Sequence, residues 1–397
     1  MRILFIHTKY LQSAGGEDTV VQAESDLMRS KGHEVLVHFF DNAVISGSPG
    51  GKLKAGVYAI YNPSSAAEIR NVIAAFKPDI VHVHNFFFAA SPSVLREVHA
   101  LRIPLIVTIH NYRLICANAL LLRDGKICEL CVSHAFPWYG VKYKCYHDSA
   151  IQSAAIGAMA AVHKWLGTWQ KVVDRYITPS AFARNKLIHS SFNVNANKIS
   201  VKPNFIPDPG PGSASERKNY FLFVGRLASE KGVNVLLEAW KELGDQKVVI
   251  AGSGPESAEL MSAYGHLNNI SFAGHKNKQE VIGLMKECRA LIFPSIWYEG
   301  LPMTIIEAFA TGTPIIASDL GAMSEMITTG ENGLLFQAGN AQSLRQSVHE
   351  FNSIVLNGDQ TLYNGARKAY VERYHPEKCY DEVMKIYSSV TDLKRVD

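Results

Sequence analysis

The sequence predicts an α/β protein of two Rossmann-like domains that face each other across a cleft. Two observations predict this fold. Short, nearly continuous apolar runs rich in β-branched residues alternate with helical patterns along the whole chain, and a segment rich in Pro, Gly and Ser interrupts the alternation near its middle. Such runs are typical of strands buried on both faces of a parallel sheet, and their alternation with helices is typical of doubly wound folds. Ligands of these folds bind beyond the carboxyl ends of the strands, so we expect the site there.

Six strands are expected in each half. In the first half they are RILFIH (2–7), EVLVHFF (34–40), DIVHVHN (79–85), PLIVTIH (104–110), RYITPS (175–180) and ISVKP (199–203). In the second half they are YFLFVGR (220–226), KVVIAG (247–252), ISFAG (270–274), ALIFPS (290–295), PIIAS (314–318) and GLLFQ (333–337).

The domain boundaries follow from the interruption. With 397 residues and a usual domain size of about 100–200, two domains are expected. We place the first at 1–205, a linker at 206–218, the second at 219–375 and a final amphipathic helix in 376–397.

Composition narrows the class of protein. Apolar residues make up 47% of the chain and charged residues 19%, as in globular proteins with large cores. The formal net charge of +4 is too small to argue for nucleic acid, although it permits contact with an anionic membrane surface.

Two glutamates, Glu299 and Glu307, stand eight positions apart in EGLPMTIIEAFATG (299–312). Pro302 suits the first turn of a helix and Gly312 its end, which places Glu307 in the helix and Glu299 in the loop before it. Eight helical residues span about 12 Å, too far for the dyad of a retaining hydrolase. The pair fits an elongated ligand better, such as a sugar–diphosphate–nucleoside, with the helix start between them as an anion site. The alternative is a surface glutamate and an ordinary helical glutamate.

Arg226 and Lys231 bracket the loop GRLASEKG (225–232), after the first strand of the second half. Arginine contacts phosphate oxygens in a bidentate manner, and lysine supplies a point charge. The loop is therefore a candidate diphosphate site, unless both are simply solvated cations.

The first half offers weaker candidates. Gly15 and Gly16 lie between a strand and a helix, where glycine lets the backbone approach an anion, or they form a flexible turn. His110 ends a strand at the expected cleft, and His84 stands in a similar place; the alternative, that each is a structural histidine, is the commoner one at strand ends.

The motifs GRLASEKG and EGLPMTIIEA, the latter with its E-x7-E spacing, resemble the large family of retaining nucleotide-sugar glycosyltransferases of GT-B fold. The resemblance covers nearly the whole chain and is more specific in the second half.

The resemblance implies roles for individual residues. Arg226 and Lys231 would hold the donor diphosphate, and Glu307 the ribose hydroxyls. Glu299 and the backbone of Gly300 and Leu301 would hold the donor sugar. Other residues would complete the site. Gly16 would contact the diphosphate and His110 would lie near the sugar, while His275 and Lys276 would border the base. The final helix would cross back onto the first domain.

The implied reaction moves a hexose-type sugar from a UDP- or GDP-sugar to a glycan or lipid-linked acceptor, with retention, in bacterial surface polysaccharide synthesis. Cations and a helix start would stabilise the charge of the leaving diphosphate. No Asp-x-Asp occurs in the sequence, so neither a metal nor another catalytic cofactor is expected. The alternatives are an epimerase or hydrolase of nucleotide sugars on the same fold, or a non-catalytic partner that kept the fold; the latter is disfavoured because all four charged residues of the motifs are present.

Four of the six cysteines, Cys116, Cys128, Cys131 and Cys145, cluster in a loop-like insert at 113–147. Their C-x2-C centre suggests a structural zinc site with four thiolate ligands. A single C-x2-C is also compatible with four unlinked thiols.

The segment 155–176 combines Trp165 and Trp169 with Lys164 and Lys171. It predicts either a helix packed under the first domain or one that lies on a membrane. Since the N-terminus does not read as a signal peptide and no apolar run reaches about 18 residues, we expect a cytoplasmic protein, with peripheral contact at the inner membrane face as a further option.

Overall fold

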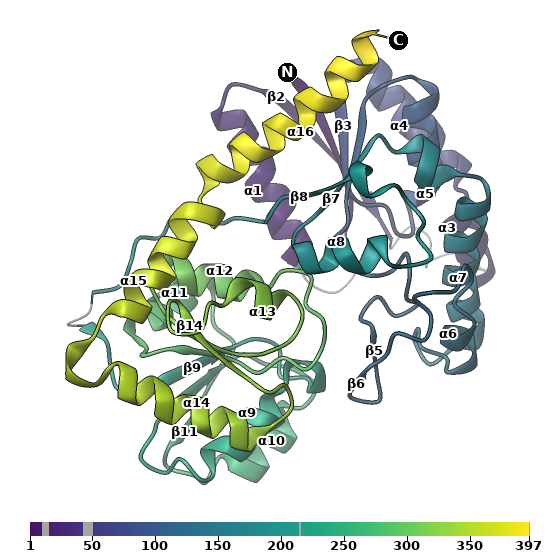
Figure 1. The fold of residues 1–397 in the computed structure, drawn as a ribbon. Coiled ribbons are helices and arrows are strands. Elements are labelled where there is room, and N and C mark those ends of the chain that lie inside the picture. Colours follow the sequence, from purple (N-terminus) through teal and green to yellow (C-terminus); the bar gives the residue numbers. More distant parts are fainter. Residues whose placement is uncertain (10–15, 43–50, 214–215, 397) are drawn as a thin grey trace. The chain divides into compact units, whose positions relative to one another are not determined.

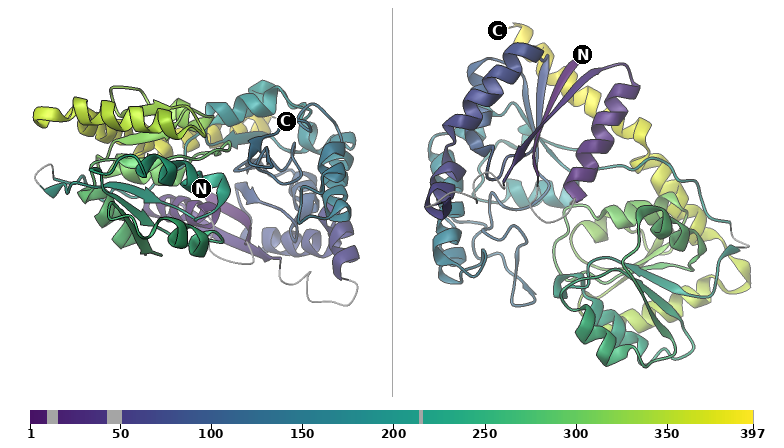
Figure 2. Two further views of the ribbon diagram at one scale, coloured as in Figure 1. Left: turned by 90° about the horizontal axis from the view of Figure 1, so that it is seen from below. Right: turned by 180° about the vertical axis from the view of Figure 1, so that it is seen from behind.

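The computed structural model describes residues 1–9, 16–42, 51–213 and 216–396. The chain forms two compact units (Figures 1 and 2). The first contains residues 1–121, 128–204 and 379–397, and the second contains residues 122–127 and 205–378.

The first unit is built on a parallel sheet with the strand order β2-β1-β3-β4-β7-β8. Its strands are β1 (Arg2–Lys9), β2 (Glu34–Asp41), β3 (Ile80–Asn85), β4 (Leu105–Thr108), β7 (Arg175–Thr178) and β8 (Ile199–Val201). Its helices are α1 (Gly16–Ser30), α3 (Gly51–Ile60), α4 (Pro63–Phe76), α5 (Ser91–Ala100), α6 (Trp138–Lys142), α7 (Ala150–Trp165) and α8 (Ala181–Ile188). All six residues of β3 are buried, as expected for a central strand covered on both faces.

The second unit repeats this plan with the order β11-β10-β9-β12-β13-β14, again parallel. Its strands are β9 (Phe221–Val224), β10 (Val248–Ala251), β11 (Ile270–Gly274), β12 (Leu291–Phe293), β13 (Ile315–Ser318) and β14 (Gly333–Phe336). Its helices are α9 (Val233–Trp240), α10 (Ser257–Tyr264), α11 (Lys278–Glu287), α12 (Met303–Ala310), α13 (Ala322–Met326), α14 (Ala341–Ile354) and α15 (Thr361–Ala369).

Alternating side chains of β9 show how the second unit forms two core layers. Phe221 and Phe223 join the cluster around Trp240 on one face of the sheet, whereas Leu222 joins the cluster around Phe309 on the other. Successive side chains of a strand point to opposite faces, so a continuous apolar run is required. All twelve predicted strands are confirmed, and so is the predicted fold class of two Rossmann-like domains.

The segment expected as a linker is packed within the second unit. Ile206 is buried in its core, and Arg367 forms an ion pair with Asp208. Arg217 donates to the backbone oxygens of Gly312 and Cys288. Of the expected linker, residues 214–215 lie outside the described residues.

The last helix, α16 (Pro376–Val396), belongs from Cys379 onward to the first unit. Val383, Tyr387 and Val390 are buried there in one cluster with Ile3 and Phe5 of β1. The Tyr387 hydroxyl also hydrogen-bonds Nδ1 of His82 at 2.8 Å, so this helix is part of the first unit's core.

A short antiparallel hairpin, β5 (Leu122–Arg123) with β6 (Lys126–Ile127), was not expected. Its turn residues Asp124 and Gly125 have φ of 52° and 69°. Asp-Gly is the preferred pair for a two-residue turn that needs positive φ at both positions.

Candidate functional site

The predicted site residues of the second unit follow three strands at one edge of its sheet. Arg226 and Lys231 lie in the loop after β9, and Glu299 lies between β12 and α12. Because β9 and β12 are parallel neighbours, their carboxyl ends bring these two loops together. His275 and Lys276 follow β11, which is two strands from β9, or about 10 Å along the sheet.

Lys231 and Glu299 form the centre of this edge. The Lys231 ammonium lies 2.8 Å from Oε1 of Glu299. The same oxygen accepts hydrogen bonds from the Ser295 hydroxyl and from Trp297 Nε1, both at 2.9 Å. The Lys231 ammonium also lies 5.4 Å from the centre of the Trp297 ring, within the range of a cation–π interaction. With its side chain only 8% exposed, the Glu299 carboxylate is held in one orientation by three donors.

Two glycines that were not predicted as site residues allow these loops to pack closely against neighbouring backbone. Gly232 has φ of 68°, and a Cβ there would lie 1.9 Å from the Pro294 carbonyl oxygen. Gly252, which follows β10, brings the next loop equally close, since its Cβ would lie 1.8 Å from the Gly225 carbonyl oxygen. The sequence signal was present, as GSG (252–254) follows a strand.

A small cavity of about 130 Å³ lies at this edge. Its lining includes Gly225, Arg226, Lys231, Ser295 and Thr304. The Arg226 side chain is 63% exposed and forms an ion pair with Glu230. The structure therefore brings Arg226 and Lys231 to one cavity, which ends close to the start of α12.

Helix α12 supplies an uncapped N-terminus. Its N-cap residue is Pro302, whose side chain accepts no capping hydrogen bond. Leu301 lies just before it. The first backbone N–H groups of a helix have no partner within the helix, and they attract anions. The helix ends at Ala310, and Gly312 has φ of 66°, so the bounds expected from Pro302 and Gly312 are confirmed.

Glu307 lies in the second turn of α12, as expected. Its carboxylate forms no hydrogen bond or ion pair within the part of the chain that the structure describes. Burial raises the pKa of Glu307, and the positive charge of Lys278 opposes this only in part. A half-buried carboxylate with unused oxygen atoms is suited to accept hydrogen bonds from hydroxyl groups.

His275 and Lys276 lie apart from this centre. His275 is exposed, and Lys276 pairs with Glu280 at 3.2 Å. Glu280 also completes the capping box of α11 with Asn277. The structure therefore places both residues on the surface at the start of α11.

In the first unit, Gly16 is the exposed first residue of α1, and Gly15 lies outside the described residues. The neighbouring Glu17 accepts hydrogen bonds from Asn85 at 3.3 Å and Asn111 at 3.0 Å. Asn85 ends β3, and Asn111 follows His110 after β4, so the start of α1 is tied to the carboxyl edge of this sheet.

A buried ionic cluster behind His110 was missed by sequence reasoning. Glu24 of α1 pairs with Lys202, which follows β8, and its Oε2 lies 3.3 Å from Nε2 of His84. Nδ1 of His84 lies 3.1 Å from Nε2 of His110. Glu24 and Lys202 are 178 residues apart in the sequence, so no local sequence pattern predicts their contact.

The expected zinc site is not supported. The four cysteines of the insert all lie among the described residues. There, the three potential metal ligands whose atoms all lie within 4.8 Å of one another are Glu24, His82 and His84, and no cysteine is among them. Sulfurs around a tetrahedral zinc ion lie about 3.8 Å apart. Instead, the Cys116 thiol donates to Asn118, and burial raises the pKa of Cys131 to about 11.

Nor does the Glu24 group suit a metal ion. The Lys202 ammonium already occupies the carboxylate. Both ring nitrogens of His82 are engaged, one with Tyr387 and the other with Thr108 at 2.7 Å.

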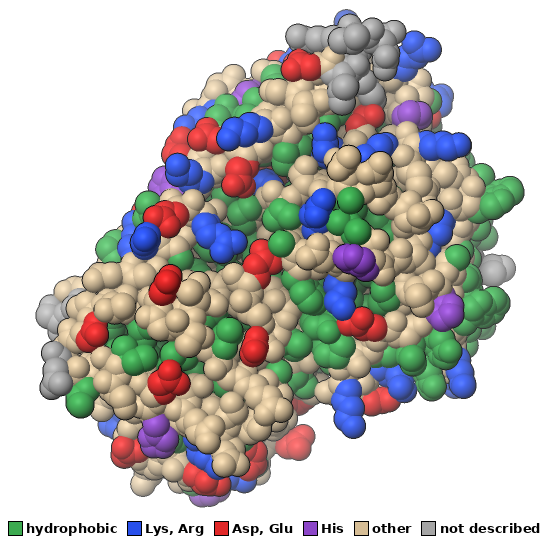
Figure 3. Space-filling view, viewed as in Figure 1, with side chains coloured by type: hydrophobic (Ala, Val, Ile, Leu, Met, Phe, Trp, Pro, Cys, Tyr) green, Lys and Arg blue, Asp and Glu red, His purple; other side chains and the backbone are tan. Residues whose placement is uncertain are grey.

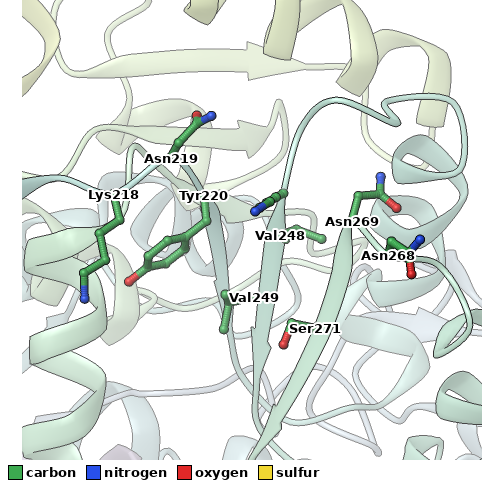
Figure 4. Close-up of a pocket in the computed structure, with 9 residues that line it drawn as sticks. Lys218, Asn219, Tyr220, Val248, Val249, Asn268, Asn269 and Ser271 are labelled. Carbon is green, nitrogen blue, oxygen red and sulfur yellow. The ribbon is translucent and has the colours of Figure 1, made fainter.

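A larger cavity, of about 290 Å³, lies at the opposite edge of the second sheet (Figure 4). Its lining residues come from the amino ends of β9, β10 and β11. Several of its polar groups are used within the fold: Lys218 pairs with Glu287, and Asn269 donates to the Trp240 carbonyl oxygen. Because the predicted site residues lie at the carboxyl ends, this cavity is not part of the candidate site.

The two tryptophans of segment 155–176 have different environments. Trp169 is buried, and its Nε1 donates to the Ala160 carbonyl oxygen, whereas Trp165 at the end of α7 is 85% exposed. Ile151, fourteen residues earlier on the same helix, is 81% exposed. Trp138 of α6 and Val57 of α3 are also exposed. Figure 3 shows apolar side chains with basic ones along this side of the first unit.

No helix among the described residues is long and apolar enough to cross a membrane.

Comparison with known proteins gives matches to both units. A family model described as Glycosyltransferase Family 4 matches residues 14–208, and one described as Glycosyl transferases group 1 matches residues 208–368. Glycosyltransferase MJ1178 of Methanocaldococcus jannaschii, which is uncharacterized, is 31% identical over 44% of this chain and 49% of its own length. O-antigen chain mannosyltransferase C of Escherichia coli is 27% identical over 44% of this chain and 48% of its own length. The matched part thus spans about half of each relative.

Among solved structures, Alr3699/HepE of Anabaena in complex with UDP is 16% identical and superimposes with a TM-score of 0.68. The alignment covers 98% of this chain and 100% of that one. At this identity the likeness concerns the fold, which is of the GT-B type.

Proposed function

Because the chain belongs to the glycosyltransferases, with a family 4 match in its first unit and a group 1 match in its second, we propose that it transfers a hexose from a UDP- or GDP-sugar to a glycan or lipid-linked acceptor. Two findings about other proteins support the substrate classes: HepE binds UDP, and the Escherichia coli relative is named for O-antigen synthesis. Surface polysaccharide synthesis in bacteria is therefore the proposed setting.

The observation that carries the proposal is the arrangement around Lys231, Glu299 and the uncapped start of α12. When the bond between sugar and diphosphate breaks, negative charge grows on the diphosphate. The cations of Arg226 and Lys231, together with the helix N-terminus, would stabilise that charge. This stabilisation needs no metal ion, and we propose metal-independent transfer.

The remaining donor contacts follow the same edge of the second unit. Glu307, with its unused carboxylate oxygens, would accept hydrogen bonds from the ribose hydroxyls. Glu299 and the backbone of Gly300 and Leu301 would hold the sugar, and the loop with His275 and Lys276 would border the base. In the first unit, we propose Gly16 as a diphosphate contact and His110 as a sugar contact.

We further propose that the reaction retains the configuration of the sugar. Three donors already engage Oε1 of Glu299, which suits this carboxylate to a holding role. We propose no covalent sugar on this carboxylate. The acceptor hydroxyl attacks C1 on the face from which the diphosphate departs; the bond between C1 and the diphosphate oxygen breaks, and the hydroxyl proton passes to the departing diphosphate.

Peripheral membrane contact belongs to the same proposal. The exposed apolar side chains Ile151, Trp138 and Trp165 lie on α6 and α7 of the first unit, with the exposed lysines Lys142 and Lys171 in the same region of the chain. Aromatic and basic side chains together suit an anionic bilayer surface, where a lipid-linked acceptor would reside.

The experiment that tests the function is incubation with UDP- and GDP-sugars and extracted lipid-linked or oligosaccharide acceptors, followed by product analysis. The expected result is a sugar linked to the acceptor in the configuration it had in the donor, with EDTA leaving the rate unchanged. An epimerised nucleotide sugar, or free sugar as the sole product, would assign the fold to an epimerase or a hydrolase instead.

A further inference from the structure

A line of buried polar contacts in the first unit ends at His110. It runs from Lys202 to Glu24, then to His84, and from His84 to His110. Glu24, His84 and Lys202 are each 3% exposed or less. Oε2 of Glu24 and Nε2 of His84 do not meet hydrogen-bond geometry, so their contact is electrostatic. The order of donors and acceptors along the line follows from which of these atoms carries charge.

The carboxylate of Glu24 fixes the first step. Burial alone would raise the pKa of Glu24, but the charge of Lys202 and the contacts with His84 and His82 hold it well below its ordinary value. Glu24 is therefore ionised and can only accept hydrogen bonds. Nε2 of His84, at 3.3 Å, must then carry the hydrogen.

The state of His84 fixes the second step. Lys202 already balances the charge of Glu24, so a second positive charge on His84 would have no counter-ion. A neutral imidazole with hydrogen on Nε2 has a lone pair on Nδ1. That atom lies 3.1 Å from Nε2 of His110, which must therefore donate. Burial lowers the pKa of His110 well below its ordinary value. His110 is thus neutral.

We propose that Glu24 and His84 are positioning residues that hold His110 in the tautomer protonated on Nε2, so that its Nδ1 offers a lone pair to a substrate hydroxyl. The proposal deepens the function proposed above and rests on His110 having a role in it. Nδ1 of His110 forms no hydrogen bond within the described residues, so this acceptor is unused. His110 therefore accepts a hydrogen bond from the substrate and does not donate one.

The surrounding groups maintain this state. His7 of β1, which bonds Asp18 at 2.7 Å, and His82 of β3 are both held neutral chiefly by burial, which lowers their pKa values. From α16, Tyr387 contributes an uncharged hydroxyl to His82. The charges of Lys202 and Glu24 cancel each other, and the Asp18 carboxylate lies against His7.

The test is a nitrogen NMR spectrum of the whole protein with ¹⁵N-labelled histidine, without substrate, in which His110→Gln identifies the His110 signals. The expected result is one neutral tautomer, protonated on Nε2, that does not titrate between about pH 5.5 and 8. A His110 that titrates near pH 6.5, or that carries its hydrogen on Nδ1, would overturn the proposal.

Two variants separate positioning from simple structure. In His84→Gln, the side-chain amide can donate to Glu24 while its oxygen accepts from His110, whereas His84→Leu can do neither. We expect His84→Leu to mix the tautomers of His110 and to lower kcat by about 10²-fold with KM nearly unchanged, and His84→Gln to restore most of both. His99→Leu, at an exposed histidine, is the control.

The two proposals fail in different ways. If folded His84→Leu keeps the same His110 tautomer, the positioning role of His84 is wrong, regardless of the transfer activity of the variant. A correct tautomer with no transfer activity in the wild type would instead count against the proposed function.

Discussion

At the scale of single residues, three glutamate carboxylates differ in the partners that their oxygen atoms have. Glu299 receives three donors on one oxygen, and Glu24 is neutralised by a buried ammonium. Glu307 has neither, although burial raises its pKa. Leaving a half-buried carboxylate without a partner costs part of its hydration free energy, and such a cost is often found at binding sites. We interpret Glu307 as a group whose partner is the ligand.

The pH dependence of Glu307→Gln tests this interpretation. A carboxyl whose pKa is raised by folding contributes stability below its unfolded pKa, about 4.3, and that contribution is lost as the pH rises through the folded value. The glutamine variant should therefore melt at a higher temperature than the wild type at pH 7.5, by an amount that shrinks as the pH falls toward 4.5. Thermal melts across this range check it, with exposed Glu350→Gln as the control. A variant that melts lower at pH 7.5 would show that Glu307 has a partner in the folded chain.

Replacing Glu299 by glutamine tests the carboxylate that has three hydrogen-bond donors, in contrast to Glu307. A glutamine oxygen cannot satisfy three donors, and the Lys231 ammonium would lose its counter-ion, so stability should fall by about 1–3 kcal/mol. Loss of the charge that fixes Lys231 should slow transfer by about 10²-fold. Urea unfolding and initial rates check both, again beside Glu350→Gln. Wild-type rates in the variant would remove Glu299 from the site.

At the scale of elements, the sequence predicted strands better than contacts. All twelve runs predicted as strands are strands, and most of them are buried on both faces, which demands continuous hydrophobicity. The hairpin β5–β6 escaped notice because its strands have two residues each, although the Asp-Gly turn was a usable signal. Lys231 and Glu299 could be assigned to one sheet edge, yet their direct contact depends on β9 and β12 being neighbours, which sequence order does not state. The four cysteines lie near enough for Cys116, Cys128 and Cys145 to affect the pKa of Cys131, but among the described residues their sulfurs form no group of three within 4.8 Å of one another.

Gly232→Ala tests how the two loops meet. Its positive φ disfavours any Cβ, and the new atom would fall 1.9 Å from the Pro294 carbonyl oxygen, so the loop must move away from Ser295 and Glu299. We expect a loss of stability of about 1–3 kcal/mol and a larger relative loss of activity, because Lys231 is displaced. Gly244→Ala, where a Cβ would meet nothing within 4 Å, should change neither. Equal behaviour of the two variants in urea unfolding and transfer assays would show that the close approach is unimportant.

At the scale of the whole molecule, the two units divide the chemistry. The second collects cations, a helix start and hydroxyl acceptors at one edge of its sheet. The first carries a buried ionic line to His110 and an exposed apolar surface on α6 and α7. Residues of α16 complete the core of the first unit, although the preceding segment belongs to the second. The chain therefore passes between the units more than once. Domain boundaries predicted from composition alone describe this arrangement only approximately.

Vesicle binding tests the apolar surface of the first unit. The full chain should co-sediment with vesicles that contain anionic lipid and much less with neutral ones. The double variant Trp138→Ser and Trp165→Ser should lose this binding while it keeps the rate of transfer to a water-soluble acceptor. Trp169 is buried and is left unchanged. Undiminished binding by the folded double variant would move the membrane contact elsewhere or remove it.

The central claim is that the second unit binds a nucleotide sugar through Lys231 and Glu307. The most direct measurement is the melting temperature of the wild type, Lys231→Ala and Glu307→Ala with UDP, GDP and ADP, because a ligand that binds only the folded state raises it. The account predicts that at least one of these nucleoside diphosphates raises the melting temperature of the wild type and that the rise is lost in both variants. No rise with any of the three, or an equal rise in all three proteins, would contradict it.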